Sequence, residues 1–578
     1  MAPSAPGRLL RLADWYQNHT RPRIVLALVV ATLYAPSLLL PFMVDDLRSL
    51  RRFRDYHAGA VDRLDLYEFC IDPAQVVAER DAGHYPWWID PQLRYRFFRP
   101  LSQFELYGNW LLFGDHAAGY RVVSVAWYVL GVWLVLALFR LFSIETTARW
   151  AALVFALAGG HAIPVIFPAA RCDLLALVAS AAAAVCAGRF LRSGGPLHLA
   201  ATLACQAAGM GCKEVTVALA VVPALLFFAL RPAAVDARAL RRRAALGSLA
   251  MLALSGAFLA FYARMHYASN GALMLDPLRA PADYLLRAPF RALLMLSTWL
   301  IQLNPFLFYF RARYAAVLVA LAIAGAVCLA LFFGHLLRRY RRLPGVVSMS
   351  GWSVIFLPIL ACTPADDRVM LLPSVGLAFL AAVWLTAGDP RPRFGRLPAA
   401  LFLLVPVLYT EGTLLTVGVL EHLADRPLRV GLAAFGRPPR PGDTLFLLNM
   451  SQPMLALWTQ DRLNTLAPPG VRVAILSDAR APTVERTGPR ALRLRAANEP
   501  LLSTFVGQMG QVRGAGPRAG QTVDLGQYRV TIESTRAGCA ESLRVQFARP
   551  LDDDRYRFIL AGWLTTDVIS FPAAPPAR

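Results

Sequence analysis

The sequence has little charge for its length. Only 17% of its 578 residues are Asp, Glu, Lys or Arg, whereas an average soluble chain has about 25%, and hydrophobic residues make up 57%. Several apolar runs are long enough to cross a hydrocarbon layer of about 30 Å. The clearest are Ile24–Val44, Ala244–Ala263, Tyr314–Leu337 and Val369–Gly388. This composition excludes a string of soluble domains and predicts an all-α polytopic membrane protein.

Lysine and paired cysteines are also scarce. Lys213 is the only lysine among 59 basic residues, so it is a candidate for a position where a guanidinium group does not serve. The eight cysteines show no CxxC pair and no zinc spacing, so neither a disulfide framework nor a metal site is expected. No cofactor is expected. Acidic and histidine side chains between residues 45 and 118 could still bind a divalent cation.

The basic residues predict an orientation in the membrane. A net charge of +22 would suit nucleic acid in a soluble protein, but the arginines lie mostly in short loops between apolar runs. Nucleic acid is therefore not expected as a partner. We expect a cytoplasmic N-terminus in a bacterial plasma (inner) membrane. With that orientation, the only basic residues in the short outer loops are Arg171, Lys213 and Arg368. The predicted spans lie near 24–44, 119–139, 150–169, 174–190, 195–212, 215–231, 244–263, 313–337, 346–364, 369–388 and 397–420.

These eleven spans divide the chain into three parts. A cytoplasmic tail, 1–23, precedes a transmembrane domain, 24–424, which includes outer loops at 45–118 and 264–312. The apolar part of the second loop, Ala292–Phe310, is expected to lie in the interface or to re-enter the membrane. Residues 425–578 are expected to form an extracytoplasmic domain.

The C-terminal region alternates apolar and polar residues as strands do. One helix is expected between the first two strands, so the region is predicted to form an α/β or β-rich domain. The predicted strands are Thr444–Asn449, Val471–Ser477, Ala491–Ala496, Tyr528–Thr535, Ser542–Ala548 and Tyr556–Trp563.

Four short charged clusters flank the predicted outer ends of spans. Ionisable residues at such positions indicate a functional site, although any single cluster could be a self-neutralising helix cap. The clusters are Asp45 with Asp46, Arg171 with Asp173, Lys213 with Glu214, and Asp366 with Asp367 and Arg368.

The clusters combine acids with cations in a way that suits transfer from a phosphate. Asp45 or Asp46 could act as a general base, and nearby cations could hold a phosphate and stabilise its departing oxygen. Lys213 would act as a point charge, whereas the guanidinium groups of Arg99, Arg171 and Arg368 could bind in bidentate fashion. A membrane lipid phosphate that carries a sugar matches both requirements.

Short motifs in the same order resemble a known family. Phe98–Ser102 and Phe113–Tyr120 are similar to the YRPL and FG-x-x-x-x-GYH elements of that family. Four further stretches are similar, in chain order, to its histidine, GR-x-DLL, SKE and ERY-x-YLPS-x-G motifs. Those stretches are Phe155–Val165, Ala170–Leu175, Cys212–Val215 and Asp367–Gly376. The family is that of the membrane O-mannosyltransferases with transmembrane segments and tetratricopeptide repeats, and the resemblance covers about residues 43–388.

The resemblance implies a GT-C-like fold and a hexosyltransferase that takes a sugar from a polyprenyl phosphate with inversion. It implies that the catalytic aspartate is Asp45 or Asp46, in the first outer loop. The donor phosphate would be bound by Arg99, Arg171, Lys213 and Arg368, with His161, Asp173, Glu214 and Asp367 in support.

The chain also departs from the family. Ala158 and Ile163 stand where the family has a histidine and a glutamate, and the repeat domain is absent. The sugar and the acceptor (protein, glycan or lipid) therefore stay open. A lipid-A or polysaccharide-modifying transferase of the same superfamily is one alternative. Another is a transporter or flippase of lipid-linked sugars, although transporters tend to place charge near midplane and to show repeats. A third is a sensor with a glycan-binding outer domain.

One aromatic cluster does not belong to these motifs. Tyr85, Trp87 and Trp88 lie in the first outer loop. Their position predicts an interfacial aromatic belt first and a sugar-stacking surface second.

Overall fold

The computed structural model describes residues 16, 21–231, 236–301, 311–386, 396–450, 459–562 and 565–571. Within these ranges the chain forms two compact units. The first, here the helical unit, comprises Met1–Leu40, Phe98–His266 and Pro277–Thr416, and the second, the sheet unit, comprises Pro41–Phe97, Tyr267–Asp276 and Val417–Arg578. Most of the predicted tail 1–23, the end of the apolar stretch 292–310 and the end of the strand predicted at 556–563 lie outside the described residues.

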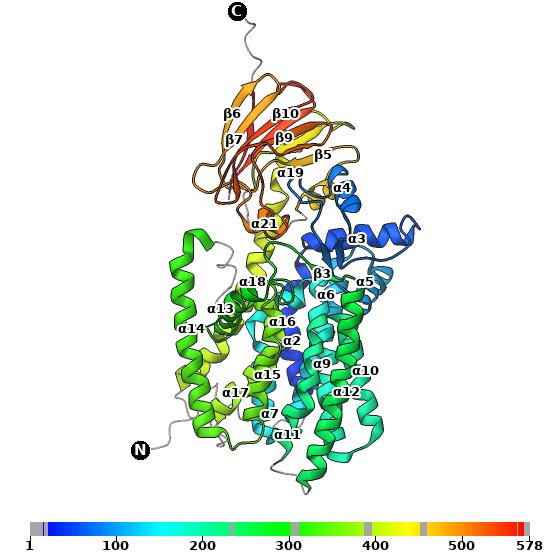
Figure 1. Cartoon of the computed structure of the whole chain (residues 1–578), viewed down its shortest axis with the longest axis vertical. Coiled ribbons are helices and arrows are strands. Elements are labelled where there is room, and N and C mark those ends of the chain that lie inside the picture. The colour runs from blue at the N-terminus through cyan, green and yellow to red at the C-terminus, as the bar shows by residue number, and fades with distance from the viewer. Residues whose placement is uncertain are drawn as a thin grey trace, which may run out of the picture. The chain divides into compact units, whose positions relative to one another are not determined.

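The helical unit consists mainly of α-helices (Figure 1). Short 3-10 helices lie between some of them. Its longer helices are α2 (Pro22–Tyr34), α5 (Pro100–Phe113), α6 (Ala117–Phe139), α7 (Glu145–Leu157), α9 (Cys172–Ser193), α10 (Pro196–Cys212), α12 (Ala237–Arg264), α13 (Pro281–Ile301), α14 (Arg311–Tyr340), α17 (Pro373–Thr386) and α18 (Arg396–Ala424). Shorter pieces are α8 (Ala162–Ile166), α11 (Val222–Leu230), α15 (Val346–Ile355) and α16 (Leu357–Leu360).

Six helical segments among the described residues are long and apolar enough to cross a membrane. They are Pro22–Leu39, Ala117–Phe139, Pro168–Ser193, Ala237–Arg264, Val319–Tyr340 and Leu403–Ala433. The pair Glu145–Leu157 and Gly159–Ile166, which is bent by 56°, makes a seventh if it is counted as one broken span. Gly159, Gly160 and Pro164 account for the bend, because glycine and proline weaken the helical ladder. The prediction of a multi-span helical membrane region is confirmed.

The predicted number of eleven spans is not reached by this criterion. The spans predicted at 195–212, 215–231, 346–364 and 369–388 fall on helical segments of 17 residues or fewer. Prolines lie at the start of three of the helices in these segments: Pro223 is the second residue of α11, Pro358 is the second residue of α16 and Pro373 is the first residue of α17. Apolar run length overestimates regular helix length wherever a proline interrupts the backbone ladder.

The sheet unit contains three sheets. One is five-stranded and antiparallel, in the order β6-β7-β10-β9-β8, and another is four-stranded, in the order β12-β11-β4-β5. The strands are β4 (Thr444–Leu447), β5 (Arg472–Ile475), β6 (Thr483–Gly488), β7 (Ala491–Arg495), β8 (Thr522–Asp524), β9 (Tyr528–Arg536), β10 (Cys539–Phe547), β11 (Tyr556–Ala561) and β12 (Thr566–Ile569). Helix α20 (Thr459–Leu466) connects the parallel pair β4 and β5, as a crossover requires.

This topology confirms the predicted β-rich C-terminal domain. Each of the six predicted strands overlaps an observed one, and α20 is the helix expected between the first two. Three further strands, β6, β8 and β12, were not predicted. Their residues are mostly half-exposed or exposed, so they lack the regular apolar alternation that marks a strand in sequence.

Residues from both predicted outer loops belong to the sheet unit. The third sheet pairs β1 (Glu68–Cys70) with β2 (Tyr95–Arg96), and β2 with β3 (Ala268–Ser269). Helices α3 (Val44–His57) and α4 (Pro73–Asp81) complete the first-loop portion. The first loop therefore folds with the C-terminal region, a grouping that sequence alone did not predict.

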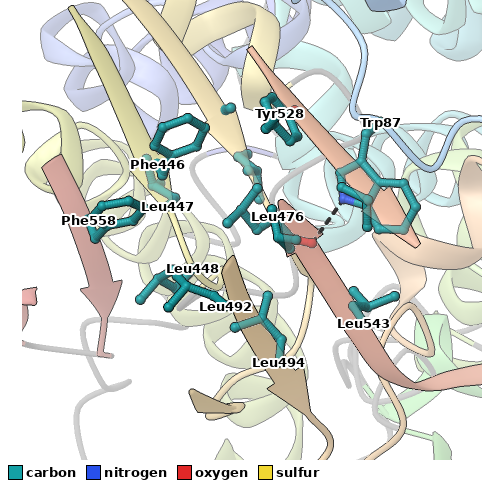
Figure 2. Packing of buried hydrophobic residues seen from close by; sticks show 14 of the residues in the cluster. Trp87, Phe446, Leu447, Leu448, Leu476, Leu492, Leu494, Tyr528, Leu543 and Phe558 are labelled. Carbon is teal, nitrogen blue, oxygen red and sulfur yellow. Dashed lines mark hydrogen bonds between the residues drawn. The ribbon is translucent and has the colours of Figure 1, made fainter. Parts of the chain in front are cut away.

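Trp87 joins the first loop to the hydrophobic core of the sheet unit. Its side chain is only 2% exposed and its indole Nε1 donates a hydrogen bond to the Leu476 carbonyl, 2.9 Å away (Figure 2). Tyr85 and Trp88 are buried as well. The rings pack within the sheet unit, and Trp87 and Trp88 also line a pocket of about 480 Å³ together with Gln511 and Arg518. The interfacial belt and the sugar-stacking surface therefore both stay predictions.

Candidate functional site

Arg171 forms a deeply buried ion pair in the helical unit. Its guanidinium is fully buried, and Nη1 lies 3.0 Å from each carboxylate oxygen of Glu105 on α5. Nε donates to the Ser124 hydroxyl at 3.1 Å and Nη2 donates to the Tyr120 carbonyl. The planar fork of an arginine is suited to such a closed set of acceptors. Arg171 therefore joins α5, α6 and the start of α9, and its donors are turned to protein groups.

Two further ion pairs lie at the same end of α9 and α10. Arg99 binds Glu214 through two hydrogen bonds, Nε to Oε2 at 3.0 Å and Nη2 to Oε1 at 2.7 Å. Lys213 donates to the carboxylate of Asp173 in the first turn of α9. Arg99 Nη1 also lies 3.5 Å from Cys172 Sγ, between Arg171 and Asp173. The structure thus brings together the predicted residues of three motifs.

Local backbone geometry explains how Lys213 and Glu214 reach different partners. Helix α10 ends at Cys212, and Lys213 is extended (φ −159°, ψ 134°) before the 3-10 helix η4 (Glu214–Val221) begins. Successive side chains of an extended segment point in opposite directions. Lys213 therefore reaches Asp173, whereas Glu214 reaches Arg99.

Arg368 lies in a second polar group of the helical unit. It pairs with Asp366, Nε to Oδ2 at 2.9 Å, and its side chain remains 43% exposed, the most accessible of the four predicted cations. Tyr409 of α18 donates a hydrogen bond to Asp367. Burial and the neighbouring Asp366 raise the pKa of Asp367 well above its ordinary value.

His161 is held by hydrogen bonds at both ring nitrogens. Nδ1 lies 2.7 Å from the Tyr128 hydroxyl and Nε2 lies 2.7 Å from the Ser374 hydroxyl. The side chain is fully buried. A Cβ at Gly160 would lie only 3.3 Å from the Asp367 carbonyl, so the glycine permits close packing of η2 (Gly159–His161) on η7 (Asp367–Leu371). These contacts favour a supporting role for His161 rather than direct binding of a ligand.

The two candidate acids lie in the first turn of α3, in the sheet unit. Asp46 is buried, and its Oδ2 accepts a hydrogen bond from the Met43 backbone N–H at 2.9 Å. An acid at this position satisfies an orphan donor of the helix start, which is a capping role. Asp45 is half-buried and lies beside it. The structure therefore distinguishes two carboxylates that sequence did not separate.

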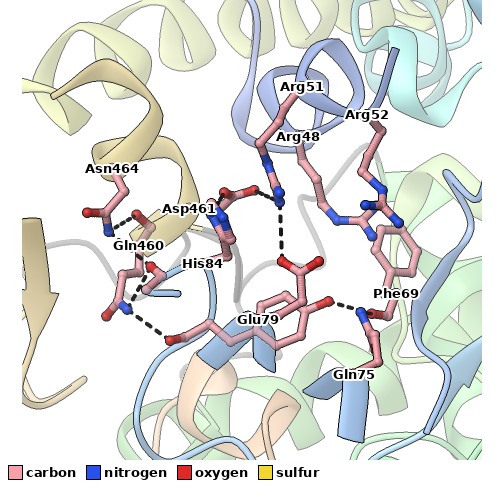
Figure 3. A network of polar contacts seen from close by, with 12 residues as sticks. Arg48, Arg51, Arg52, Phe69, Gln75, Glu79, His84, Gln460, Asp461 and Asn464 are labelled. Carbon is pink, nitrogen blue, oxygen red and sulfur yellow. Dashed lines mark hydrogen bonds and ion pairs between the residues drawn. The ribbon is translucent and has the colours of Figure 1, made fainter. Parts of the chain in front are cut away.

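A polar network connects α3 and the first loop to α20 (Figure 3). The carboxylate of Asp461 lies 2.7 Å from His84 Nδ1 and 3.3 Å from Arg51 Nη2. Gln460 Nε2 donates to the carbonyls of Gly83 and Tyr85, at 2.9 and 2.8 Å. Burial alone would raise the pKa of Asp461, but the hydrogen bond from His84 and the charges of Arg51, His84 and Arg48 lower it below its ordinary value.

Sequence reasoning missed four residues of these groups. Glu105, Tyr409, Asp461 and Arg51 each bind a partner far away in the chain. Glu105 lies between two of the quoted motifs, so an acid on an apolar helix was the signal available for it. Nothing in the local pattern of Asp461 separates it from a surface acid. No group of three or more His, Cys, Asp and Glu side chains suited to a metal occurs within the described ranges.

The chain was also compared with known proteins. No protein-family model and no curated protein sequence matches it. The ArnT protein of Cupriavidus metallidurans, solved bound to undecaprenyl phosphate, is similar with 14% identity and a TM-score of 0.38 over 79% of this chain and 90% of that one. The oligosaccharyltransferase of Archaeoglobus fulgidus is similar with 12% identity and a TM-score of 0.42 over 80% of this chain and 65% of that one.

A second structure from Archaeoglobus fulgidus has a comparable likeness. It is the oligosaccharyltransferase AglB in complex with an inhibitory peptide and a dolichol-phosphate, with 11% identity and a TM-score of 0.35 over 75% of this chain and 62% of that one. These are likenesses of overall arrangement at low identity.

Proposed function

We propose that the protein is a membrane glycosyltransferase that moves a sugar from a polyprenyl phosphate to an acceptor on the extracytoplasmic face. The observation that carries this proposal is the gathering of three cation–carboxylate pairs at one end of α9 and α10. Three pairs at one end of an apolar bundle exceed what capping needs. The motifs that supply these residues resemble those of enzymes acting on lipid-linked sugars.

Exposure and pairing suggest a division of labour among the cations. Arg171 is buried and its donors face protein acceptors, so we assign it to ordering α5, α6 and α9. The side chains of Arg99 and Lys213 retain 13% and 11% exposure, and Arg368 is more open still. We assign Arg99, Lys213 and Arg368 to the donor phosphate, where they would neutralise the leaving phosphate oxygen.

The carboxylates that now pair with these cations supply part of the mechanism. Glu214 and Asp173 hold Arg99 and Lys213 in fixed directions. A phosphate that approaches would share the same donors, and the carboxylates would keep the cations aligned. Such preorganisation lowers the reorganisation cost during the reaction.

We assign the general base to Asp45. Asp46 is 3% exposed, and its Oδ2 accepts the hydrogen bond from the Met43 N–H at the start of α3, which favours a capping role. Asp45 is half-buried in the same turn. The Asp45 carboxylate would take the proton from an acceptor hydroxyl as that oxygen attacks the anomeric carbon. The bond from the anomeric carbon to the phosphate oxygen breaks in the same step, and polyprenyl phosphate leaves with inversion.

Polyprenyl-phosphate release from a panel of lipid-linked sugars tests the proposal. Purified full-length protein should release polyprenyl phosphate from one donor of the panel, and Asp45→Asn with Asp46→Asn should abolish the release. Thermal unfolding of the double variant must show a cooperative transition, so that loss of activity is not loss of fold. Undiminished release by a folded double variant would overturn the assignment of the base.

A further inference from the structure

A pocket of about 290 Å³ lies in the helical unit along α6, between α2 and α9. Its wall is almost wholly apolar and includes Leu130, Trp133, Ala137, Ala182 and Val185. The volume is close to the lower limit of about 300 Å³ for pockets that bind small molecules. Trp133 Nε1 donates to the Arg23 carbonyl at 2.9 Å, so the ring is fixed where α2 meets α6.

Two arginines complete the wall of this pocket. Arg23 is the second residue of α2 and Arg189 lies near the end of α9, and both side chains are exposed. Neither guanidinium makes an ion pair or hydrogen bond with another residue in the part of the chain that the structure describes. Helices α2 and α6 carry no acidic residue, and the single acid of α9 is Asp173. Asp173 lies 16 residues before Arg189, or about 24 Å along the helix.

The ordinary reasons for basic residues at helix ends account for only part of this arrangement. Positive charge favours the cytoplasmic ends of spans and the C-terminal ends of helices. Those effects explain why Arg23 and Arg189 are basic. They do not explain why both line one apolar pocket whose described lining residues include no carboxylate. An amphiphile with an apolar chain and an anionic head would supply both missing partners.

We infer that this pocket binds a diacyl phospholipid with an anionic head group. An acyl chain would occupy the apolar space lined by α6 and α9, and the phosphate would lie between the two guanidinium groups. The pocket lies at the end of α9 opposite Asp173 and Lys213, so it is separate from the proposed donor site. In a membrane, phospholipid is the most abundant anionic amphiphile around this end of α9. The inference does not depend on the glycosyltransferase proposal.

Binding of phosphatidylglycerol and phosphatidylcholine to the purified protein tests the inference. Native mass spectrometry in a nonionic detergent should show tighter binding of phosphatidylglycerol than of phosphatidylcholine with the same chains. Each of Arg23→Gln and Arg189→Gln should weaken phosphatidylglycerol binding about fivefold, and the pair about 30-fold, since a basic residue near an anionic lipid is worth about 1 kcal/mol. Ala182→Phe should weaken binding with both arginines retained, because it fills the apolar wall.

Arg241→Gln with Arg242→Gln is the matched control. Both arginines are exposed on α12, outside the pocket, so this variant removes the same charge and should bind phosphatidylglycerol as the unaltered protein does. Equal losses in the control and in Arg23→Gln with Arg189→Gln would mean nonspecific attraction and would overturn the inference. Tighter binding of undecaprenyl phosphate than of phosphatidylglycerol at the same arginines would overturn the identity of the lipid.

Discussion

Asp461 is the residue through which the C-terminal region holds the first loop most directly. Its side chain is 1% exposed and it accepts from His84 and Arg51, which come from the first loop. Asp461→Asn keeps the shape of the side chain and removes the charge. Gln460 and Asn464 still donate to the Gly83 carbonyl, so the loop keeps part of its attachment. The substitution should therefore loosen the first loop without unfolding the sheet unit.

The expected loss follows from the two charged contacts. A hydrogen bond to a charged group contributes about 1.5–3 kcal/mol, and Arg51 and His84 are partly solvated, so the upper end of the range for buried pairs does not apply. We expect the free energy of local opening to fall by about 2–3 kcal/mol. Amide hydrogens that exchange through this opening should then exchange roughly 30- to 150-fold faster.

Hydrogen exchange of the full-length protein, followed by mass spectrometry, measures this opening. Peptides from α3 and from residues 73–90 should exchange faster in Asp461→Asn, whereas peptides from β9 and β10 should not change. Asp552→Asn, an exposed carboxylate of the same unit, is the matched control and should behave as the unaltered protein. Unchanged exchange of residues 73–90 in Asp461→Asn would refute the reasoning.

The same contacts predict a pH dependence. The pKa of Asp461 is lowered in the folded protein, so its stabilising contribution is present above the ordinary value of about 3.9 and is lost as pH falls through the lowered value. The difference in exchange rate between Asp461→Asn and the unaltered protein should therefore be largest at neutral pH. It should disappear below about pH 4. A difference that stays constant through this range would contradict the assigned charge.

Three further substitutions test other contacts. Lys213→Arg should lower sugar transfer roughly 10- to 100-fold at unchanged expression, because a planar guanidinium group cannot replace the point charge held against Asp173. Full activity of this variant would mean that the single lysine has no special role. Glu105→Gln should lower the stability measured by thermal unfolding by about 3–5 kcal/mol, because Arg171 loses its buried counter-charge, and added Arg171→Leu should recover much of the loss. Trp87→Phe should cost about 2 kcal/mol, since the indole hydrogen bond is lost and its carbonyl acceptor stays buried; a loss below about 0.5 kcal/mol would contradict that.

The parts of the fold with strong local periodicity could be predicted from sequence. Strands such as β9 and β10 alternate regularly, and spans such as α6 and α12 are continuous apolar helices. Prolines shortened other helices, because an apolar run does not show where the hydrogen-bond ladder breaks. The strand pairing of β2 with β3 joins residues far apart in the chain, and no local pattern specifies it.

The candidate site was partly predictable for the same reason. Arg99, Asp173, Lys213 and Glu214 are recognisable because charge is rare in apolar sequence, and the structure brings them together. Their pairing was not predictable, since it depends on the turn that separates Lys213 from Glu214. The difference between the two acids of α3 required the hydrogen bond from Met43 to Asp46, which only coordinates reveal.

A comparison of Asp45→Asn with Asp46→Asn in donor turnover tests whether Asp45 is the general base. Both purified variants would be assayed for polyprenyl-phosphate release from the donor that the unaltered protein uses, alongside thermal unfolding. Asp45→Asn should unfold as the unaltered protein does and release no polyprenyl phosphate. Asp46→Asn should lose about 1 kcal/mol of stability and keep most of its activity. Full release by Asp45→Asn, with loss of release in a stably folded Asp46→Asn, would contradict that assignment.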